Sequence, residues 1–146
     1  MNEVQIASPQ SLPRVVLSPI EQARLIDLAQ AASAKDADVA AMLMNEADRA
    51  ELVPACLIPD SVVVMRSYVE FRDDTDGTVR QVQLVYPKDA DIAQDRISIL
   101  TPIGAALIGL QEGQIIPWPT RDGRERTITV LRVDRVPLRA PKKKAV

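Results

Sequence analysis

Two neighbouring carboxylates, Asp36 and Asp38, are the residues whose type and spacing could most directly do chemistry. A protruding pair of acidic side chains could hold a divalent metal ion that is supplied with a partner's active site. Residues spaced i, i+2 point apart on a helix, however, and acidic residues also suit the positive N-terminal end of a helix dipole. We favour helix stabilisation and solubility for this pair, with metal binding as the alternative.

Composition excludes most other catalytic arrangements. The sequence contains no histidine, which removes Ser-His and Cys-His nucleophiles and most zinc sites. The single cysteine, Cys56, lies in an apolar context without an activating neighbour, and we predict that it packs in a hinge. The DDTDG stretch does not fit a calcium loop, because Arg72 and Gln83 stand at its two anchoring positions. We therefore predict no catalytic residue, no cofactor and no metal site.

Two short amphipathic helices are predicted in the first third of the chain. Ser18 is the N-cap of the first helix, Pro19 its first helical residue, and Glu21 reaches back to complete a capping box. Either Ser33 or Asp36 could cap the second helix. The tight connection predicts an antiparallel hairpin, and helices of about fourteen residues extend only about 20 Å.

After Pro59 the hydrophobic period changes from helical to two, which is typical of β-strands. Pro117 in the stretch 114–118, and Pro119 just after it, place this stretch at a sheet edge or an irregular strand end. The predicted strands are 62–72, 78–87, 97–100, 114–118 and 125–133. Together with one short helix they predict an α+β fold, in which the helical hairpin precedes a small antiparallel sheet domain.

The short helix lies in the stretch LTPIGAALIGLQEGQ. A Thr101-Pro102 start and a stop at Gly109 bound it, as in other capped helices. Its apolar residues recur with helical spacing and predict one buried stripe, formed by Ile103, Ala106, Leu107 and Leu110.

These elements predict four segments along the chain. The change of period at Pro59 suggests that the hairpin and the sheet domain are separable modules. The expected segments are a disordered N-terminus (1–13), the hairpin (14–58), the sheet domain (59–136) and a basic tail (137–146).

Composition also predicts where the protein acts. One cysteine forms no internal disulfide, and neither a signal peptide nor a membrane span is recognisable, so we expect a cytoplasmic protein. Aromatic residues make up only 3% of the chain, too few for an aromatic-lined ligand pocket. Residues 120–146 carry nine Lys/Arg and three Asp/Glu, a balance of +6 against −8 for the preceding residues. This basic end either touches nucleic acid weakly or is simply solvated.

Several sequence motifs resemble those of a known family. Ile97-Ser98-Ile99, Pro102-Ile103, residues 106–109 and Glu112-Gly113 match the C-terminal domain of the bacterial Gre transcript-cleavage factors. A closer resemblance is to the Rnk family, regulators of nucleoside diphosphate kinase. The motifs of that family appear here in order as NEADRA, DGTVR, LVYPK and TPIGAALIGLQEGQ. The resemblance extends from Ser18 to Val133.

The resemblance implies an FKBP-like C-terminal fold and a non-enzymatic regulator of transcription. It implies binding to RNA polymerase near the secondary channel, in competition with Gre-type factors, and control of nucleoside diphosphate kinase levels. We expect neither a small-molecule substrate nor a membrane partner. The candidate contact residues are Thr101, Pro102, Ile103 and Gly104, with Gly104 expected on the solvent side of its helix.

Two other functions remain as alternatives. The first is a Gre-like cleavage factor in which Asp36 and Asp38 hold a catalytic magnesium ion. The acidic tip motif of the Gre factors is absent, however, and the predicted hairpin is shorter than theirs. The second and weaker alternative is a peptidyl-prolyl isomerase, suggested only by the FKBP-like fold.

Overall fold

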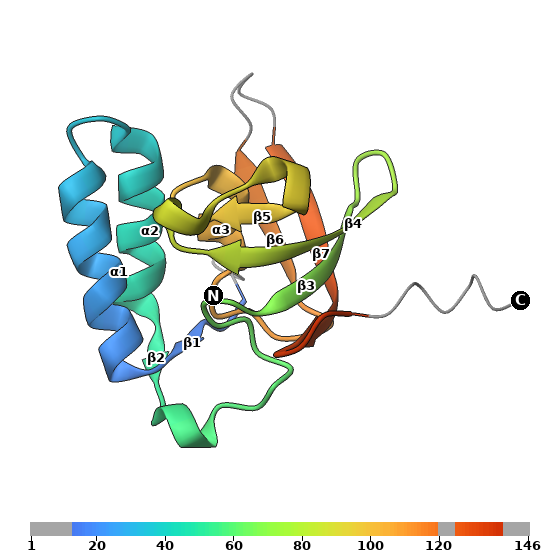
Figure 1. Ribbon diagram of the computed structural model, residues 1–146, viewed down its shortest axis with the longest axis horizontal. Helices are drawn as coiled ribbons and strands as arrows, with labels where there is room; N and C mark the ends of the chain where they lie inside the picture. The colour runs from blue at the N-terminus through green and yellow to red at the C-terminus, as the bar shows by residue number, and fades with distance from the viewer. Residues whose placement is uncertain (1–12, 120–124, 139–146) are drawn as a thin grey trace, which may run out of the picture.

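The helical hairpin forms as predicted. The computed structural model describes residues 13–119 and 125–138, and in it α1 (Pro19–Ala32) and α2 (Ala37–Arg49) lie antiparallel (Figure 1). The Ser18 hydroxyl accepts a hydrogen bond from the Glu21 backbone N–H at 3.1 Å, which confirms the first N-cap. Of the two candidate caps for α2, Asp36 is the one used, and its carboxylate accepts from the Val39 N–H at 3.2 Å.

A small parallel pair of strands joins the two ends of the hairpin. β1 (Val16–Leu17) precedes α1 and pairs with β2 (Glu51–Leu52), which follows α2. A 3-10 turn, η2 (Ala55–Leu57), then leads toward the sheet domain. Cys56 on this turn is exposed, so the prediction that it packs in the hinge is wrong. The turn protrudes from the molecule, away from the hydrophobic core (Figure 1).

A five-stranded sheet forms the rest of the molecule, in the order β5-β4-β3-β7-β6. Neighbouring strands are antiparallel except β4 and β5, which are parallel, whereas the sequence predicted an antiparallel sheet. Two 3-10 turns, η3 (Pro87–Asp89) and η4 (Ile92–Gln94), carry the chain between these strands. The strands are β3 (Tyr68–Asp73), β4 (Thr78–Val85), β5 (Arg96–Ser98), β6 (Ile115–Pro119) and β7 (Glu125–Asp134).

Two strand predictions can be compared with these bounds. The strand predicted at 62–72 begins only at Tyr68, because a turn closed by Ser67 N–H to the Val64 carbonyl at 3.0 Å interrupts it. Arg66 in that turn has a φ of 72°, which no strand accommodates. The edge position expected for 114–118 is confirmed, since β6 contacts only β7 in the sheet.

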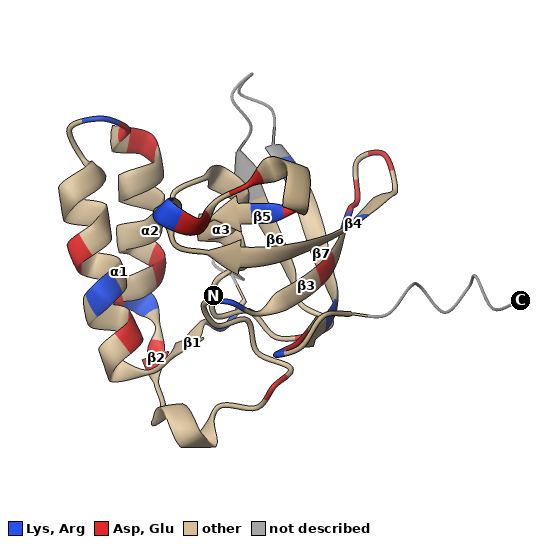
Figure 2. Ribbon diagram, in the orientation of Figure 1, with Lys and Arg blue, Asp and Glu red and all other residues tan. Residues whose placement is uncertain are grey.

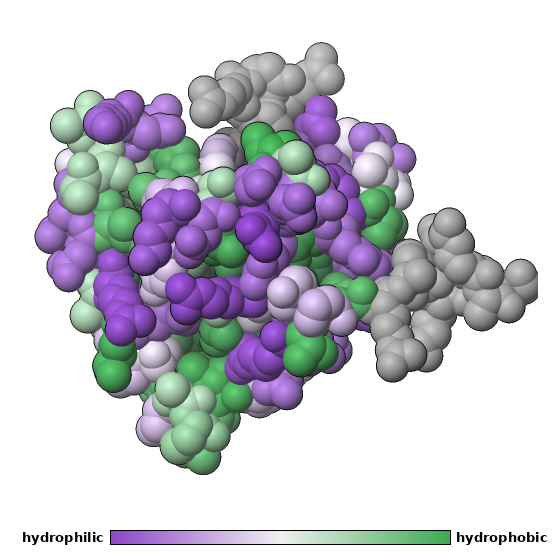
Figure 3. All heavy atoms as spheres, in the orientation of Figure 1, coloured by the Kyte–Doolittle hydropathy of each residue, from purple (hydrophilic) through white to green (hydrophobic). Residues whose placement is uncertain are grey.

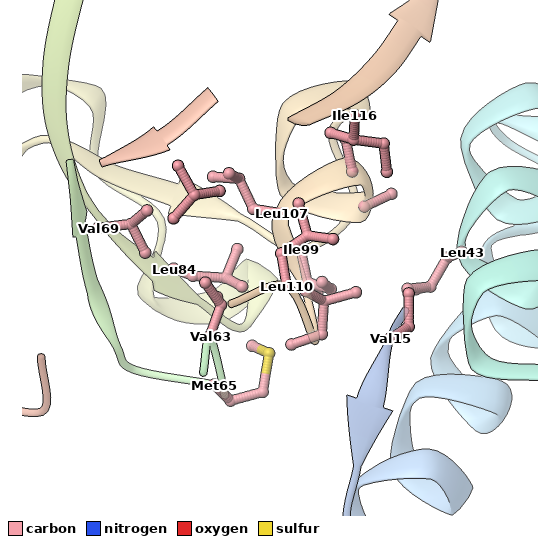
Figure 4. Close-up of a cluster of buried hydrophobic side chains, with 14 of the residues drawn as sticks. Val15, Leu43, Val63, Met65, Val69, Leu84, Ile99, Leu107, Leu110 and Ile116 are labelled. Atoms are coloured by element: carbon pink, nitrogen blue, oxygen red, sulfur yellow. The ribbon is translucent and has the colours of Figure 1, made fainter. Parts of the chain in front are cut away.

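One hydrophobic core joins the hairpin to the sheet domain. The buried cluster includes Leu25 from α1, Leu43 from α2 and Leu17 from β1, together with strand residues such as Val69 and Leu84. Figure 4 shows Val15 and Leu43 pointing from the hairpin side toward the side chains of the sheet domain. The hairpin therefore buries its apolar face against the sheet domain and does not project away from it.

A half-buried carboxylate strengthens the same junction. Glu21 was expected to reach back to Ser18, but its side chain accepts a hydrogen bond from the Met65 N–H at 3.2 Å. Burial raises the pKa of the Glu21 carboxyl above its usual range, while the Met65 N–H and the charges of Arg135 and Arg24 act in the opposite direction. Glu21 thus fastens α1 to the turn that precedes β3.

Other sequence expectations concern the ends of the chain. Residues 1–12 and 139–146, which hold most of the predicted disordered N-terminus and basic tail, lie outside the described residues. Among the helices that the structure describes, none combines the length and apolar character needed to cross a membrane.

The shared core argues against the expectation that the two segments fold separately, and both their separability and the position of their boundary stay predictions. We expect that a fragment of residues 59–146 will not unfold cooperatively, because removing the hairpin exposes apolar side chains of the sheet domain. Thermal unfolding followed by circular dichroism measures this. Leu43→Ala in the full chain should lower the free energy of unfolding by about 2–5 kcal/mol, because it leaves a cavity in the shared core. A fragment with a sharp, reversible transition would support separable modules instead.

Candidate docking surface

The predicted contact residues lie at the start of α3 (Pro102–Leu107). Thr101 is its N-cap, and the Thr101 hydroxyl oxygen accepts from the Gly104 N–H at 3.1 Å. The same hydroxyl donates to the Ser98 carbonyl at 2.7 Å, which ties the helix start to the end of β5. Pro102 occupies a first-turn position where a missing N–H costs nothing.

α3 is buried on more than the predicted stripe. Leu107 and Leu110 are fully buried and Ala106 nearly so, as expected, whereas Ile103 is only half-buried. Ala105, which lies off the stripe, is also fully buried, and so is Ile108, the residue that follows the helix. The helix is therefore a central core element rather than an amphipathic surface helix.

Gly104 does not face solvent, and this part of the sequence prediction is wrong. The residue is buried, and a Cβ added to it would lie 2.3 Å from the Ser98 carbonyl oxygen and 2.9 Å from Ile99 Cα. Both neighbours are backbone atoms of the strand end that α3 packs against. A glycine is needed here because two backbone segments approach each other closely.

The accessible part of this motif is therefore Thr101, Pro102 and Ile103, which we call the helix-start surface. All three side chains are half-buried. Such residues combine partial access from solvent with a position fixed by the core beneath them. This arrangement can contact a macromolecular partner, and it offers no nucleophile or general base for a reaction.

The acidic pair lies in a different place from the helix-start surface. Asp36 is half-buried and its carboxylate caps α2, whereas Asp38 is exposed in the first turn of the same helix. Both lie at the tip of the hairpin, at the opposite end from β1 and β2 (Figure 1). Within the described residues, no group of three or more Asp, Glu or Cys side chains could hold a metal ion.

One surface feature was not predicted from the sequence. A cleft of about 590 Å³ separates α1 from the turn that follows β4. We call it the α1–β4 cleft; it is lined by Arg24, Asp27, Leu28, Arg66 and residues 86–88. Figure 3 shows this face of the molecule, with hydrophobic atoms visible between hydrophilic ones beside α1. The i, i+3, i+4 spacing in α1 places its three residues on one helical face, but no local signal pairs that face with residues 86–88.

The amino-acid sequence is similar to those of a regulator of nucleoside diphosphate kinase and of transcription elongation factors. Residues 58–135 match the family model described as transcription elongation factor GreA/GreB, C-terminal. The chain is 32% identical over 127 residues to the Escherichia coli K12 protein named regulator of nucleoside diphosphate kinase, covering 87% of this chain and 93% of that protein. It is also 39% identical over 70 residues to transcription elongation factor GreA of Syntrophobacter fumaroxidans, covering 48% of this chain and 44% of that protein.

A solved structure has the same fold. The prokaryotic transcription elongation factor GreA/GreB from Nitrosomonas europaea superposes with a TM-score of 0.64 at 35% identity, covering 84% of this chain and 98% of that chain. The α+β architecture, with its N-terminal hairpin and C-terminal sheet domain, is thereby confirmed.

The close approach at Gly104 predicts the effect of adding one methyl group. If helix propensity alone mattered, Gly104→Ala would stabilise the protein by up to about 1 kcal/mol. We expect the opposite, a loss of about 1–3 kcal/mol, because the new Cβ must push backbone atoms of β5 away. Chemical denaturation of the two proteins measures the difference, and an unchanged or raised stability of Gly104→Ala would contradict the packing described here.

Proposed function

The chain belongs to the Rnk family of nucleoside diphosphate kinase regulators, whose C-terminal domain is that of the GreA/GreB elongation factors, and from this we propose that it regulates transcription by binding RNA polymerase. The proposed contact is the helix-start surface. The proposed place is the polymerase at or near its secondary channel, where the protein competes with Gre-type factors.

The extent of each match carries this proposal. The GreA relative shares less than half of its length with this chain, and the family model covers residues 58–135. The portion that the family model of the elongation factors shares with this chain is therefore the sheet domain, which contains the helix-start surface. Because elongation of a transcript is the work of RNA polymerase, a domain shared by both groups is the best candidate for the polymerase contact.

The hairpin supports a regulator rather than a cleavage enzyme. Its helices contain 14 and 13 residues, a length of about 20 Å at 1.5 Å per residue. The Asp36 carboxylate is engaged by the Val39 N–H, which leaves Asp38 as the accessible acid of the pair. The relatives are named as regulators and elongation factors, and control of nucleoside diphosphate kinase levels would follow from the action on transcription.

Substitution of Pro102 tests the polymerase contact. Pro102→Glu places bulk and negative charge on the helix-start surface, while an acidic residue in the first helical turn suits the helix dipole. We expect at least tenfold weaker competition with a labelled Gre factor for purified RNA polymerase, equivalent to about 1.4 kcal/mol. The melting temperature should change little.

Pro19→Glu is the matched control, because Pro19 occupies the same helical position after a hydroxyl N-cap in α1 and is exposed. It should compete like the unmodified protein. If Pro102→Glu stays folded and competes normally, the contact lies elsewhere on the molecule. If the unmodified chain does not bind polymerase at all, the proposed function is wrong.

Transcript cleavage separates the proposal from its first alternative. We expect that the purified protein does not shorten transcripts in backtracked polymerase complexes in which a Gre factor does so. Cleavage that disappears in Asp36→Ala with Asp38→Ala would establish the alternative. Asp36→Ala alone removes the α2 N-cap and should cost about 1 kcal/mol of stability. The Asp38→Ala variant must therefore be measured separately.

A further inference from the structure

The α1–β4 cleft combines an apolar floor with a basic rim. Leu28 and Tyr86 are half-buried side chains that pack against the hydrophobic core and leave part of their surface facing the cleft. Pro87 continues this apolar surface and is exposed. The Arg66 guanidinium lies over the Tyr86 ring, 5.9 Å from its centroid. Stacking of this kind fixes the guanidinium plane and leaves its N–H edges available to an anion.

The charge around the cleft is opposite in sign to that of the whole chain. Arg24, Arg66 and Lys88 line it, and Asp27 is the acidic residue among the described lining residues. The chain as a whole has a net charge of −2. Figure 2 shows basic segments on α1 and on the turn after β4 that faces it. The cleft is thus a local positive site on an acidic protein.

In the described part of the chain, the basic side chains of the cleft form no strong ion pairs. The Arg66 Nη2 atom is 3.9 Å from the Asp89 Oδ2 atom, and the two side chains are 63% and 42% exposed. An exposed pair at that distance contributes little free energy. For Arg24 and Lys88, the described part of the chain holds no ion pair within 4.0 Å. A partner's carboxylate could therefore bind these side chains without breaking a strong ion pair.

We infer that the α1–β4 cleft binds an acidic amphipathic segment of a protein partner, whose apolar side chain covers Leu28 and Tyr86 and whose carboxylates face Arg24, Arg66 and Lys88. The basic residues around the cleft favour an acidic occupant, because charges across an interface tend to be complementary. The open rim makes the cleft unsuitable for a small anion, which would stay largely exposed to solvent. Small-ligand sites bury most of their ligand, whereas Arg66 is largely exposed here. A polypeptide segment brings enough surface to cover both floor and rim. The site is separate in sequence from the helix-start surface and does not depend on polymerase binding.

A defined peptide can test this inference with the full chain. The probe is a capped peptide of about 14 residues, long enough to form a helix, with leucines every three or four positions and glutamates between them. One control peptide replaces the glutamates with lysines, and a second replaces the leucines with serines. We expect the acidic amphipathic peptide to bind with a Kd below about 1 mM. NMR shift changes should concentrate at residues 24–28 and 86–88.

Charge reversal identifies the site. Arg24→Glu with Lys88→Glu should weaken binding of the probe at least tenfold. The matched control, Lys35→Glu with Arg80→Glu, changes the net charge equally at exposed positions outside the cleft and should leave binding within about twofold. If the reversed variant loses its cooperative unfolding transition, Arg24→Gln with Lys88→Gln takes its place, with an expected loss of at least threefold.

Four results would overturn the inference. They are no binding of the probe, equal binding of the lysine peptide, equal weakening in the control variant, and shift changes away from the cleft. Inorganic tripolyphosphate and adenosine diphosphate are tested in parallel. Tighter binding of either at residues 24–28 and 86–88 than of the acidic peptide would mean a small-anion site and would also overturn it. None of these outcomes bears on polymerase binding, which the Pro102→Glu comparison measures separately.

Discussion

The fold depends on close contacts near the two ends of α3, where glycines leave no side chain in the way. Gly104 lies against the backbone of Ser98 and Ile99, and Gly109 lies against residues 15–16. At the second contact the Val16 N–H donates to the Gly109 carbonyl at 3.0 Å, and Gly109 has a φ of 78°. α3 is therefore held between the edge of the sheet and the strand that begins the hairpin. A Cβ at either glycine would separate two parts of the molecule that share one core.

Glu21 lies at the same junction, and its partial burial disfavours the ionised form of its carboxyl. Because burial raises the pKa of the Glu21 carboxyl, the folded state binds its proton more tightly than the unfolded state does. The stability gained from this proton is present at low pH and is lost as the pH rises through the folded-state pKa. The Met65 N–H and the charges of Arg135 and Arg24 favour the ionised carboxylate and so oppose the effect of burial on this pKa. Arg135 also donates to the Val62 and Pro59 carbonyls, so it holds the segment that follows the hairpin.

Local signals in the sequence predicted what local forces determine. Hydroxyl N-caps predicted the starts of α1 and α3, Asp36 was one of two candidate caps for α2, and prolines predicted the edge position of β6. The features that were missed arise from contacts between distant segments. Gly104 satisfies the same helical spacing whether it faces solvent or another backbone, and only the position of β5 decides between them. Likewise, Glu21 has a suitable partner in its own capping box, yet it bonds Met65, which is 44 residues away.

The arrangement of the hairpin also limits what the acidic pair can do. An arm that delivers carboxylates to a partner's active site must project beyond the body of the protein. Here α2 packs along α3, Leu25 and Leu43 enter the common core, and α1 forms one wall of the α1–β4 cleft. Lengthening the helices would be needed to move Asp38 away from this body, since the rise per residue is fixed. In this chain the hairpin instead packs against the sheet domain and forms one wall of the α1–β4 cleft, an arrangement that supports the proposed regulator rather than the cleavage-factor alternative.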